Sequence, residues 1–119
     1  MDSEELKERT KEFAIKIIKL VENFPKTNTG DVIGKQLLKS ATSIGANYRS
    51  ACRAQSHAHF ISKISIVEEE ADETIYWLEL TVESKLTTQD QVTDLIKEAN
   101  ELTAIFTSSR KTAKRRQKI

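Results

Sequence analysis

The sequence predicts an all-α protein that folds as an antiparallel up-down-up-down four-helix bundle. Three observations favour this fold. The chain has only three glycines and one proline in 119 residues, so long helices are favoured over short strands. Apolar residues recur every three or four positions in four segments. The loops between these segments are short, which requires antiparallel neighbours. We place the bundle at residues 1–109 and a basic C-terminal tail at residues 110–119.

The first helix is expected over about residues 3–24, because Asp2 and Glu5 have the spacing of an N-terminal cap. The second helix is expected to begin after Asp31, a suitable N-cap, and to end near Ala54. The apolar positions of these two segments have helical spacing: Leu6, Thr10, Phe13, Ile17, Val21 and Phe24 in the first, and Ile33, Leu37, Ala41, Ile44, Tyr48 and Ala51 in the second.

The third helix is expected over about residues 57–84, with Ser56 as its N-cap. Thr88 and Gln91 fit a capping box at the start of the fourth helix. Their core positions are Phe60, Ile64, Val67, Ala71, Ile75, Leu78 and Val82 in the third helix, and Val92, Leu95, Ala99, Leu102 and Phe106 in the fourth.

Composition and charge favour a soluble, cytoplasmic protein with no membrane segment. No run of about 18 apolar residues occurs, and the polar, acidic N-terminus is unlike a signal peptide. Cys52 is the only cysteine, which fits a reducing compartment. The net charge of +1 hides an asymmetry, because residues 110–119 contain six basic residues and no acidic one, whereas residues 1–109 carry a net charge of −5.

The basic C-terminal tail is the main indication of a partner. Lysine and arginine side chains that neutralise phosphates release counterions, so such a tail predicts salt-sensitive binding of RNA or DNA. The absence of interleaved aromatic residues argues against base stacking. A solubilising tail without a specific partner is the alternative. The candidate nucleic-acid-binding residues are Arg110, Lys111, Lys114, Arg115, Arg116 and Lys118.

The predicted third helix has more apolar surface than one core stripe requires. Ile66, Trp77 and Leu80 fall beside or opposite that stripe and are bordered by charges, which is typical of a subunit contact. In the alternative, Trp77 lies at the edge of the monomer core. The predicted oligomer interface comprises Asn47, which could bond across it, the pairs Arg49/Arg53 and Glu70/Glu73 as opposing charges, and Ile66, Trp77 and Leu80.

Motifs for catalysis or metal binding are weak. The acidic run at residues 68–73 lacks the Glu-x-x-His pattern of di-metal bundles, so we predict no metal and no cofactor. Arg53 followed by His59 resembles the Arg-x(4–6)-His pattern of HEPN-class ribonucleases, in which histidine transfers a proton and arginine stabilises phosphoryl charge. We expect a non-enzymatic oligomeric scaffold. A ribonuclease using Arg53 and His59, or a purely structural module, are the alternatives.

The stretch LLKSATSIGANYRSACRAQSHAHFISKISIVEEEADETIYWLEL, residues 37–80, resembles a family of four-helix bundle proteins encoded in intervening sequences of bacterial 23S ribosomal RNA genes. Ser43, Ile44 and Asn47, followed by an acidic and then aromatic helix, carry the resemblance. It implies a ring-like homopentamer. The stretch is also similar to the accessory protein of diversity-generating retroelements, which implies a basic nucleic-acid-binding surface and a nucleic-acid-processing partner. The run at residues 48–51 departs from the Ile-Ala-Glu-Gly-like run of many members, so no role of that glutamate is transferred.

Overall fold

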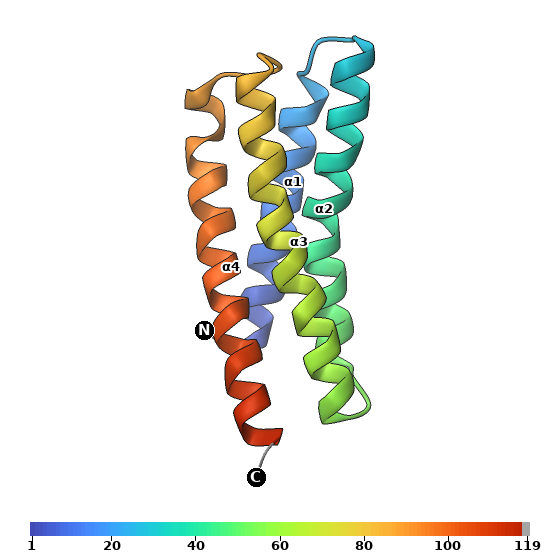
Figure 1. Ribbon diagram of the computed structural model, residues 1–119, viewed down its shortest axis with the longest axis vertical. Coiled ribbons are helices and arrows are strands. Elements are labelled where there is room, and N and C mark those ends of the chain that lie inside the picture. The colour runs from blue at the N-terminus through green and yellow to red at the C-terminus, as the bar shows by residue number, and fades with distance from the viewer. Residues whose placement is uncertain (118–119) are drawn as a thin grey trace.

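The computed structural model describes residues 1–117 and consists of four helices. Consecutive helices are connected at alternating ends of the molecule (Figure 1), so sequence neighbours run antiparallel. This confirms the predicted four-helix bundle, which is elongated, with extents of 51 × 22 × 21 Å. Within the part of the chain that is described, no helix is long and apolar enough to cross a membrane. The helices are α1 (Ser3–Glu22), α2 (Asn28–Cys52), α3 (His57–Glu83) and α4 (Gln89–Gln117).

Side-chain caps begin α1 and α3 as predicted. The Asp2 carboxylate accepts a hydrogen bond from the backbone N–H of Glu5 at 2.8 Å, and the Ser56 hydroxyl accepts one from the N–H of His59 at 3.0 Å. Each bond satisfies a backbone donor that has no partner within the helix.

Helix α4 also begins directly after Thr88, as predicted. The bonds there are not those of the predicted capping box, because the N–H of Gln91 donates to the backbone carbonyl of Thr88 at 3.2 Å and the Gln91 side chain accepts from the hydroxyl of Thr87 at 2.9 Å.

Helix α2 begins earlier than predicted, and the assignment of Asp31 as its N-cap was wrong. The hydroxyl of Thr27 caps the helix by accepting from the N–H of Gly30 at 3.0 Å. Asp31 lies instead in the first turn, where a carboxylate is favourable beside the positive end of the helix dipole. The segment PKTNTG has loop-forming residues, but its first threonine, Thr27, is also a good N-cap.

Helix α4 continues through the position where the sequence predicted the start of a tail. Residues 110–117 form its last turns, and Ala113 is buried there. The boundary predicted at residue 109 is therefore not a break in the secondary structure. Lysine, arginine, alanine and glutamine are good helix formers, and basic side chains are favourable at the negative end of a helix dipole. Lys118 lies outside the described residues.

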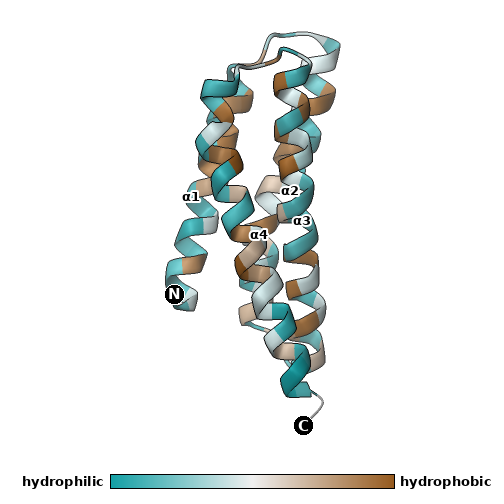
Figure 2. Ribbon diagram, turned by 60° about the vertical axis from the view of Figure 1, so that its left-hand side comes forward, coloured by the Kyte–Doolittle hydropathy of each residue, from teal (hydrophilic) through white to brown (hydrophobic). Residues whose placement is uncertain are grey.

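The core lies along the axis of the bundle. Hydrophobic residues recur along each helix between hydrophilic ones (Figure 2). The Tyr48 ring of α2 packs on the Phe106 ring of α4, with 5.3 Å between the ring centroids. The largest fully buried apolar side chains are Phe13, Ile17, Leu37, Ile44, Ile64, Val67, Leu78, Val92, Leu102 and Phe106.

The buried face of α3 differs in part from the predicted stripe. Phe60, Ile75 and Val82 are only half-buried. Thr74 and Thr81 are fully buried instead. The hydroxyl of Thr74 donates to the backbone carbonyl of Glu70 at 2.7 Å and lies 3.0 Å from the hydroxyl of Ser40 in α2. Apolar periodicity missed these positions because internal hydrogen bonds allow a hydroxyl to be buried.

Glycines allow α1 and α2 to approach each other closely. A Cβ atom at Gly34 would lie 3.0 Å from Cγ1 of Val21, and one at Gly45 would lie 3.2 Å from Oγ1 of Thr10. Both glycines belong to α2 and both contacts are made with α1. The lack of a side chain therefore sets the spacing of these two helices.

An ion-pair cluster joins α1 to α4. The guanidinium of Arg9 donates to Glu98 at 2.6 and 2.7 Å and to Glu101 at 3.1 Å. These hydrogen bonds raise the pKa of Arg9, chiefly through Glu98, and the bond from Arg9 lowers the pKa of Glu98. The pair is partly shielded from water, which makes it stronger than a fully exposed pair.

The lowered pKa of Glu98 predicts a loss of stability in acid. A carboxylate whose pKa is depressed by folding stabilises the fold above its unfolded pKa, and this contribution is lost as the pH falls through the folded pKa. The free energy of unfolding of the wild type should fall below about pH 4.3. In both Glu98→Gln and Arg9→Gln we expect this fall to be smaller. Urea unfolding at a series of pH values measures it. Wild-type pH dependence in both variants would contradict the assignment.

Candidate nucleic-acid interface

One end of the bundle is basic. The end of α2, the start of α3 and the last turns of α4 lie together there (Figure 1). Residues 49–67 and 102–117, which form this end, contain no aspartate or glutamate. We call this surface the basic end. Its arginines and lysines are Arg49, Arg53, Lys63, Arg110, Lys111, Lys114, Arg115 and Arg116.

A histidine holds the last turns of α4 against the start of α3. Nε2 of His57 lies 2.7 Å from the backbone carbonyl oxygen of Ala113. Because a carbonyl only accepts hydrogen bonds, the ring nitrogen is the donor. Ala113 is itself buried. The basic side chains on the last turns of α4 therefore project from a helix end that is bonded to the start of α3.

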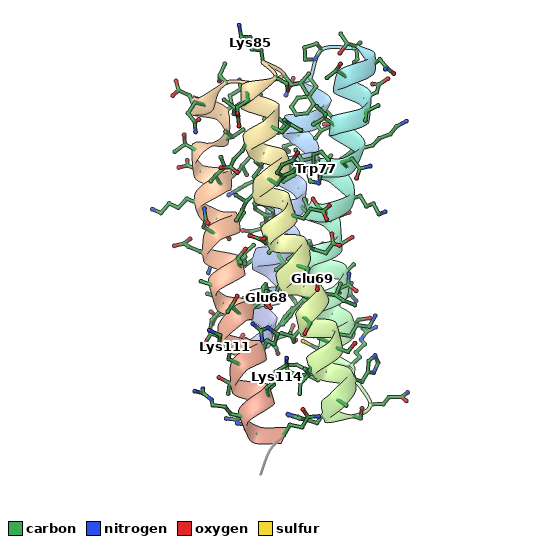
Figure 3. All side chains as sticks on the ribbon, in the orientation of Figure 1. Glu68, Glu69, Trp77, Lys85, Lys111 and Lys114 are labelled. Atoms are coloured by element: carbon green, nitrogen blue, oxygen red, sulfur yellow. The ribbon has the colours of Figure 1, made fainter. Side chains whose placement is uncertain are left out.

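Arg110 differs from the other predicted nucleic-acid-binding residues. Its Nε donates to Glu68 of α3 at 2.5 Å, and Thr107 donates to the same carboxylate at 2.5 Å. The hydrogen bond from Arg110 is the main cause of the lowered pKa of Glu68. Figure 3 shows Glu68 on α3 beside the part of α4 that carries Lys111 and Lys114. Arg110 therefore links two helices, and its charge is largely compensated.

The remaining predicted residues of this set are exposed on α4. Lys111, Lys114, Arg115 and Arg116 all lie on the surface of its last turns. Among the described residues, no ion pair joins any of these four to a carboxylate. They can therefore meet phosphates without first breaking an internal pair.

A second part of the basic end is a shallow hollow between α2 and α3. It has a volume of about 390 Å³ and is lined by Arg49 and Arg53 of the α2 end and by His59 of the first α3 turns, with Ala46, Ser50 and Gln55. The structure thus brings the predicted pair Arg53 and His59 to one hollow. The first turn of α3 contains no acidic residue, so the positive end of the helix dipole is not compensated there.

The apolar residues of the predicted oligomer interface lie beside the buried face of α3. Ile66, Trp77 and Leu80 are each half-buried in the single chain, and Trp77 packs against the edge of the monomer core, as the alternative interpretation expected. The indole N–H of Trp77 donates to Glu73 at 3.0 Å, one helical turn away. The Tyr76 ring meets the indole edge-on, with 5.0 Å between centroids.

The polar residues of that predicted interface lie in three different environments. The Asn47 amide donates to the backbone carbonyl of Ser43 at 2.9 Å, which satisfies that donor within α2. Partial burial, assisted by the negative charge of Glu73, raises the pKa of Glu70. Arg49 and Arg53 belong to the basic end, and none of the ion pairs found in residues 1–117 includes them.

Sequence reasoning missed several exposed apolar side chains. Ile15 and Ile18 of α1, Val32 of α2 and Tyr76 of α3 are large apolar side chains exposed to solvent. A groove also runs between α1 and α2. The available signal was the position of Ile15 and Ile18 away from the apolar stripe of the first helix.

Comparisons with known proteins agree with the fold. Residues 3–108 match the model of the 23S rRNA-intervening sequence protein family. A crystal structure of a protein of unknown function from the S23 ribosomal protein family of Bacteroides thetaiotaomicron is 39% identical and superposes with a TM-score of 0.82. The match covers 88% of this chain and 97% of that one. No curated protein matches. Because the family match spans nearly the whole helical bundle, the chain belongs to the 23S rRNA-intervening sequence protein family.

Proposed function

We propose that this protein is a non-enzymatic, cytoplasmic helical scaffold that assembles as a homopentamer and binds the backbone of RNA or DNA through its basic end. The observation that carries the nucleic-acid role is the absence of any carboxylate from residues 49–67 and 102–117, which hold eight arginines and lysines, and of these eight only Arg110 is in an ion pair within the described part of the chain, with Glu68. The resemblance to ring-forming family members supports the pentamer. A nucleic-acid-processing protein is the partner that such a scaffold would assist.

The chemistry of the basic end favours phosphates over bases. Lysine and arginine neutralise phosphates without reading sequence. Stacking of bases requires exposed aromatic rings. The one large aromatic residue exposed in the described part of the chain is Tyr76, in the second half of α3. We therefore expect binding that depends on charge and depends little on sequence.

The test is the salt dependence of binding to a short duplex RNA, with duplex DNA of the same sequence in parallel. Fluorescence anisotropy would give the dissociation constant at salt concentrations from about 50 to 200 mM. We expect the logarithm of the affinity to fall linearly with the logarithm of the salt concentration. Absence of binding at low salt, or binding that salt does not weaken, would overturn the proposal.

A ribonuclease is the second candidate, because Arg53 and His59 line the same hollow. A histidine there could take the proton of a ribose 2′-hydroxyl while an arginine stabilises the charge that develops on the phosphate. Incubation of the full chain with the same RNA, followed by gel electrophoresis, separates the two functions. Intact RNA supports the scaffold. Cleavage that is lost in His59→Ala, while RNA binding persists, would support the enzyme.

A further inference from the structure

We infer that the hollow between the end of α2 and the start of α3 binds a terminal phosphate, the phosphomonoester at the end of an RNA or DNA strand. This inference rests on the proposed function and names the chemical group that one part of the basic end recognises. We call this site the α2–α3 hollow. Its volume is about 390 Å³, and its lining consists of Ala46, Arg49, Ser50, Arg53, Gln55 and His59.

Every polar side chain that lines the α2–α3 hollow can donate a hydrogen bond. Arginine, histidine, glutamine and serine side chains all carry N–H or O–H groups, and the lining contains no carboxylate. The hollow between α1 and α4 is a contrast, because its lining includes the carboxylates of Glu12, Asp94, Glu98 and Glu101. An anion would be repelled there, whereas the composition of the α2–α3 hollow favours an anionic ligand.

Two arginines form the wall of the hollow on the α2 side. Arg49 lies in the last turn of α2 and Arg53 is the C-cap residue, four positions later, so both project from the same side of the helix. Both are exposed, and within residues 1–117 no carboxylate forms an ion pair with either. Like charges at this spacing repel each other. An anion bound between the two guanidinium groups relieves that repulsion.

The start of α3 forms the opposite wall. His59 lies in the first turn of this helix, and Gln55 directly precedes the N-cap residue Ser56. The imidazole of His59 carries a donor N–H whether it is neutral or protonated. The first turn contains no acidic residue, so the partial positive charge of this helix end adds to the charge of the arginines. Positive potential therefore reaches the hollow from two helices.

A terminal phosphate matches this arrangement better than a phosphate within a strand. A phosphomonoester carries about 1.5 to 2 negative charges at pH 7 and has three free oxygens, whereas a phosphate between two nucleotides carries about one charge. Arginine binds phosphate through two parallel N–H···O bonds. The oxygens of a terminal phosphate can therefore accept from both guanidinium groups at the same time, and its greater charge strengthens each bond.

The α2–α3 hollow lies at one tip of the elongated bundle, beside the α2–α3 connection (Figure 1). A strand end can enter at a tip without the rest of the strand bending around the molecule. His57, in the same turn as His59, is bonded to Ala113 of α4, so the last turns of α4 lie on the other side of the α3 start. The bundle is only about 22 Å wide. One strand can therefore reach both the hollow and the exposed cations of α4.

The test compares single-stranded DNA that ends in a 5′-phosphate with the same strand ending in a 5′-hydroxyl. A second pair of strands makes the same comparison at the 3′ end. DNA lacks the 2′-hydroxyl that a ribonuclease would need, and the hydroxyl strand is longer by two nucleotides, each with about one charge, so that total charge is matched. Fluorescence anisotropy at about 50 mM salt gives both affinities. At one or both ends, we expect the phosphorylated strand to bind about tenfold more tightly.

Two double variants assign this preference to the hollow. Arg49→Gln with Arg53→Gln should remove the preference for the phosphorylated strand. The matched control, Arg115→Gln with Arg116→Gln, removes the same charge from α4 outside the hollow, so it should weaken the binding of both strands and keep the preference. All four side chains are exposed. The fold should therefore survive, and the circular dichroism spectrum checks this.

Equal affinities of the wild type for phosphorylated and hydroxyl strands at both ends would overturn the inference. A preference that persists in the Arg49 and Arg53 variant would also overturn it, because the phosphate would then be recognised elsewhere. In either case, salt-sensitive binding of duplex RNA by the wild type leaves the proposed function standing. A wild-type chain that binds none of these nucleic acids overturns both.

Discussion

Replacing Phe106 with alanine is expected to lower the free energy of unfolding by about 3–5 kcal/mol. Phe106 is 0% exposed, and its ring packs on Tyr48 across the bundle, with 5.3 Å between centroids. The substitution removes buried apolar surface, leaves a cavity and breaks the aromatic contact between α4 and α2. Since domains of this kind are stable by only about 5–15 kcal/mol, the variant should be close to unfolding at moderate temperature.

Urea unfolding followed by circular dichroism measures this effect. Val32→Ala is the matched control, because Val32 is an apolar helical residue with 54% of its surface exposed. Its free energy of unfolding should stay within about 0.5 kcal/mol of wild type. A change below about 1 kcal/mol for Phe106→Ala would contradict the central position of this ring in the core.

The second large effect concerns the charges at the end of α4. Changing Lys111, Lys114, Arg115 and Arg116 to glutamine is expected to reduce the magnitude of the salt slope by about 3–4, because each neutralised phosphate contributes about 0.9 on duplex DNA. The affinity advantage of wild type at low salt should then shrink by roughly 100-fold on raising the salt about fourfold. Fluorescence anisotropy with duplex DNA measures both quantities.

The control removes the same charge elsewhere, by changing Lys16, Lys19, Lys85 and Lys97 to glutamine, and should keep most of the wild-type slope. Substitution is a sharper test than deletion of residues 110–119. Deletion would also remove buried Ala113 and the Arg110–Glu68 pair, and so would disturb the packing of α3 and α4. Equal slopes for the two four-residue variants would mean that the end of α4 is not the binding surface.

Sequence pattern predicted the structure correctly where the interactions join residues close together in the chain. The caps formed by Asp2 and Ser56 depend on side chains three residues from the N–H groups that they accept, so their spacing is visible in the sequence. Asp31 misled for the same reason, because aspartate and threonine are both suitable N-caps and the sequence places both near the start of this helix.

The candidate site could be predicted only in part. The basic run after residue 109 is evident from composition, and its membership of α4 follows from the favourable contacts of Ala113 and Arg110 with α3. Periodicity could not indicate that Glu68 compensates the charge of Arg110, because these residues are 42 positions apart. The hollow that joins Arg53 to His59 depends on how the α2–α3 turn folds back.

The sequence by itself determined the helical class, the four helices, the family and the separation of acidic and basic segments, since each follows from local propensity, periodicity or composition. Only the tertiary structure decided which apolar residues stay exposed. Ile15 and Ile18 lie on the exposed side of the α1–α2 pair, whose close approach is permitted by Gly34 and Gly45. Burial depends on the positions of neighbouring helices, and those positions are set by side-chain contacts between residues far apart in the chain.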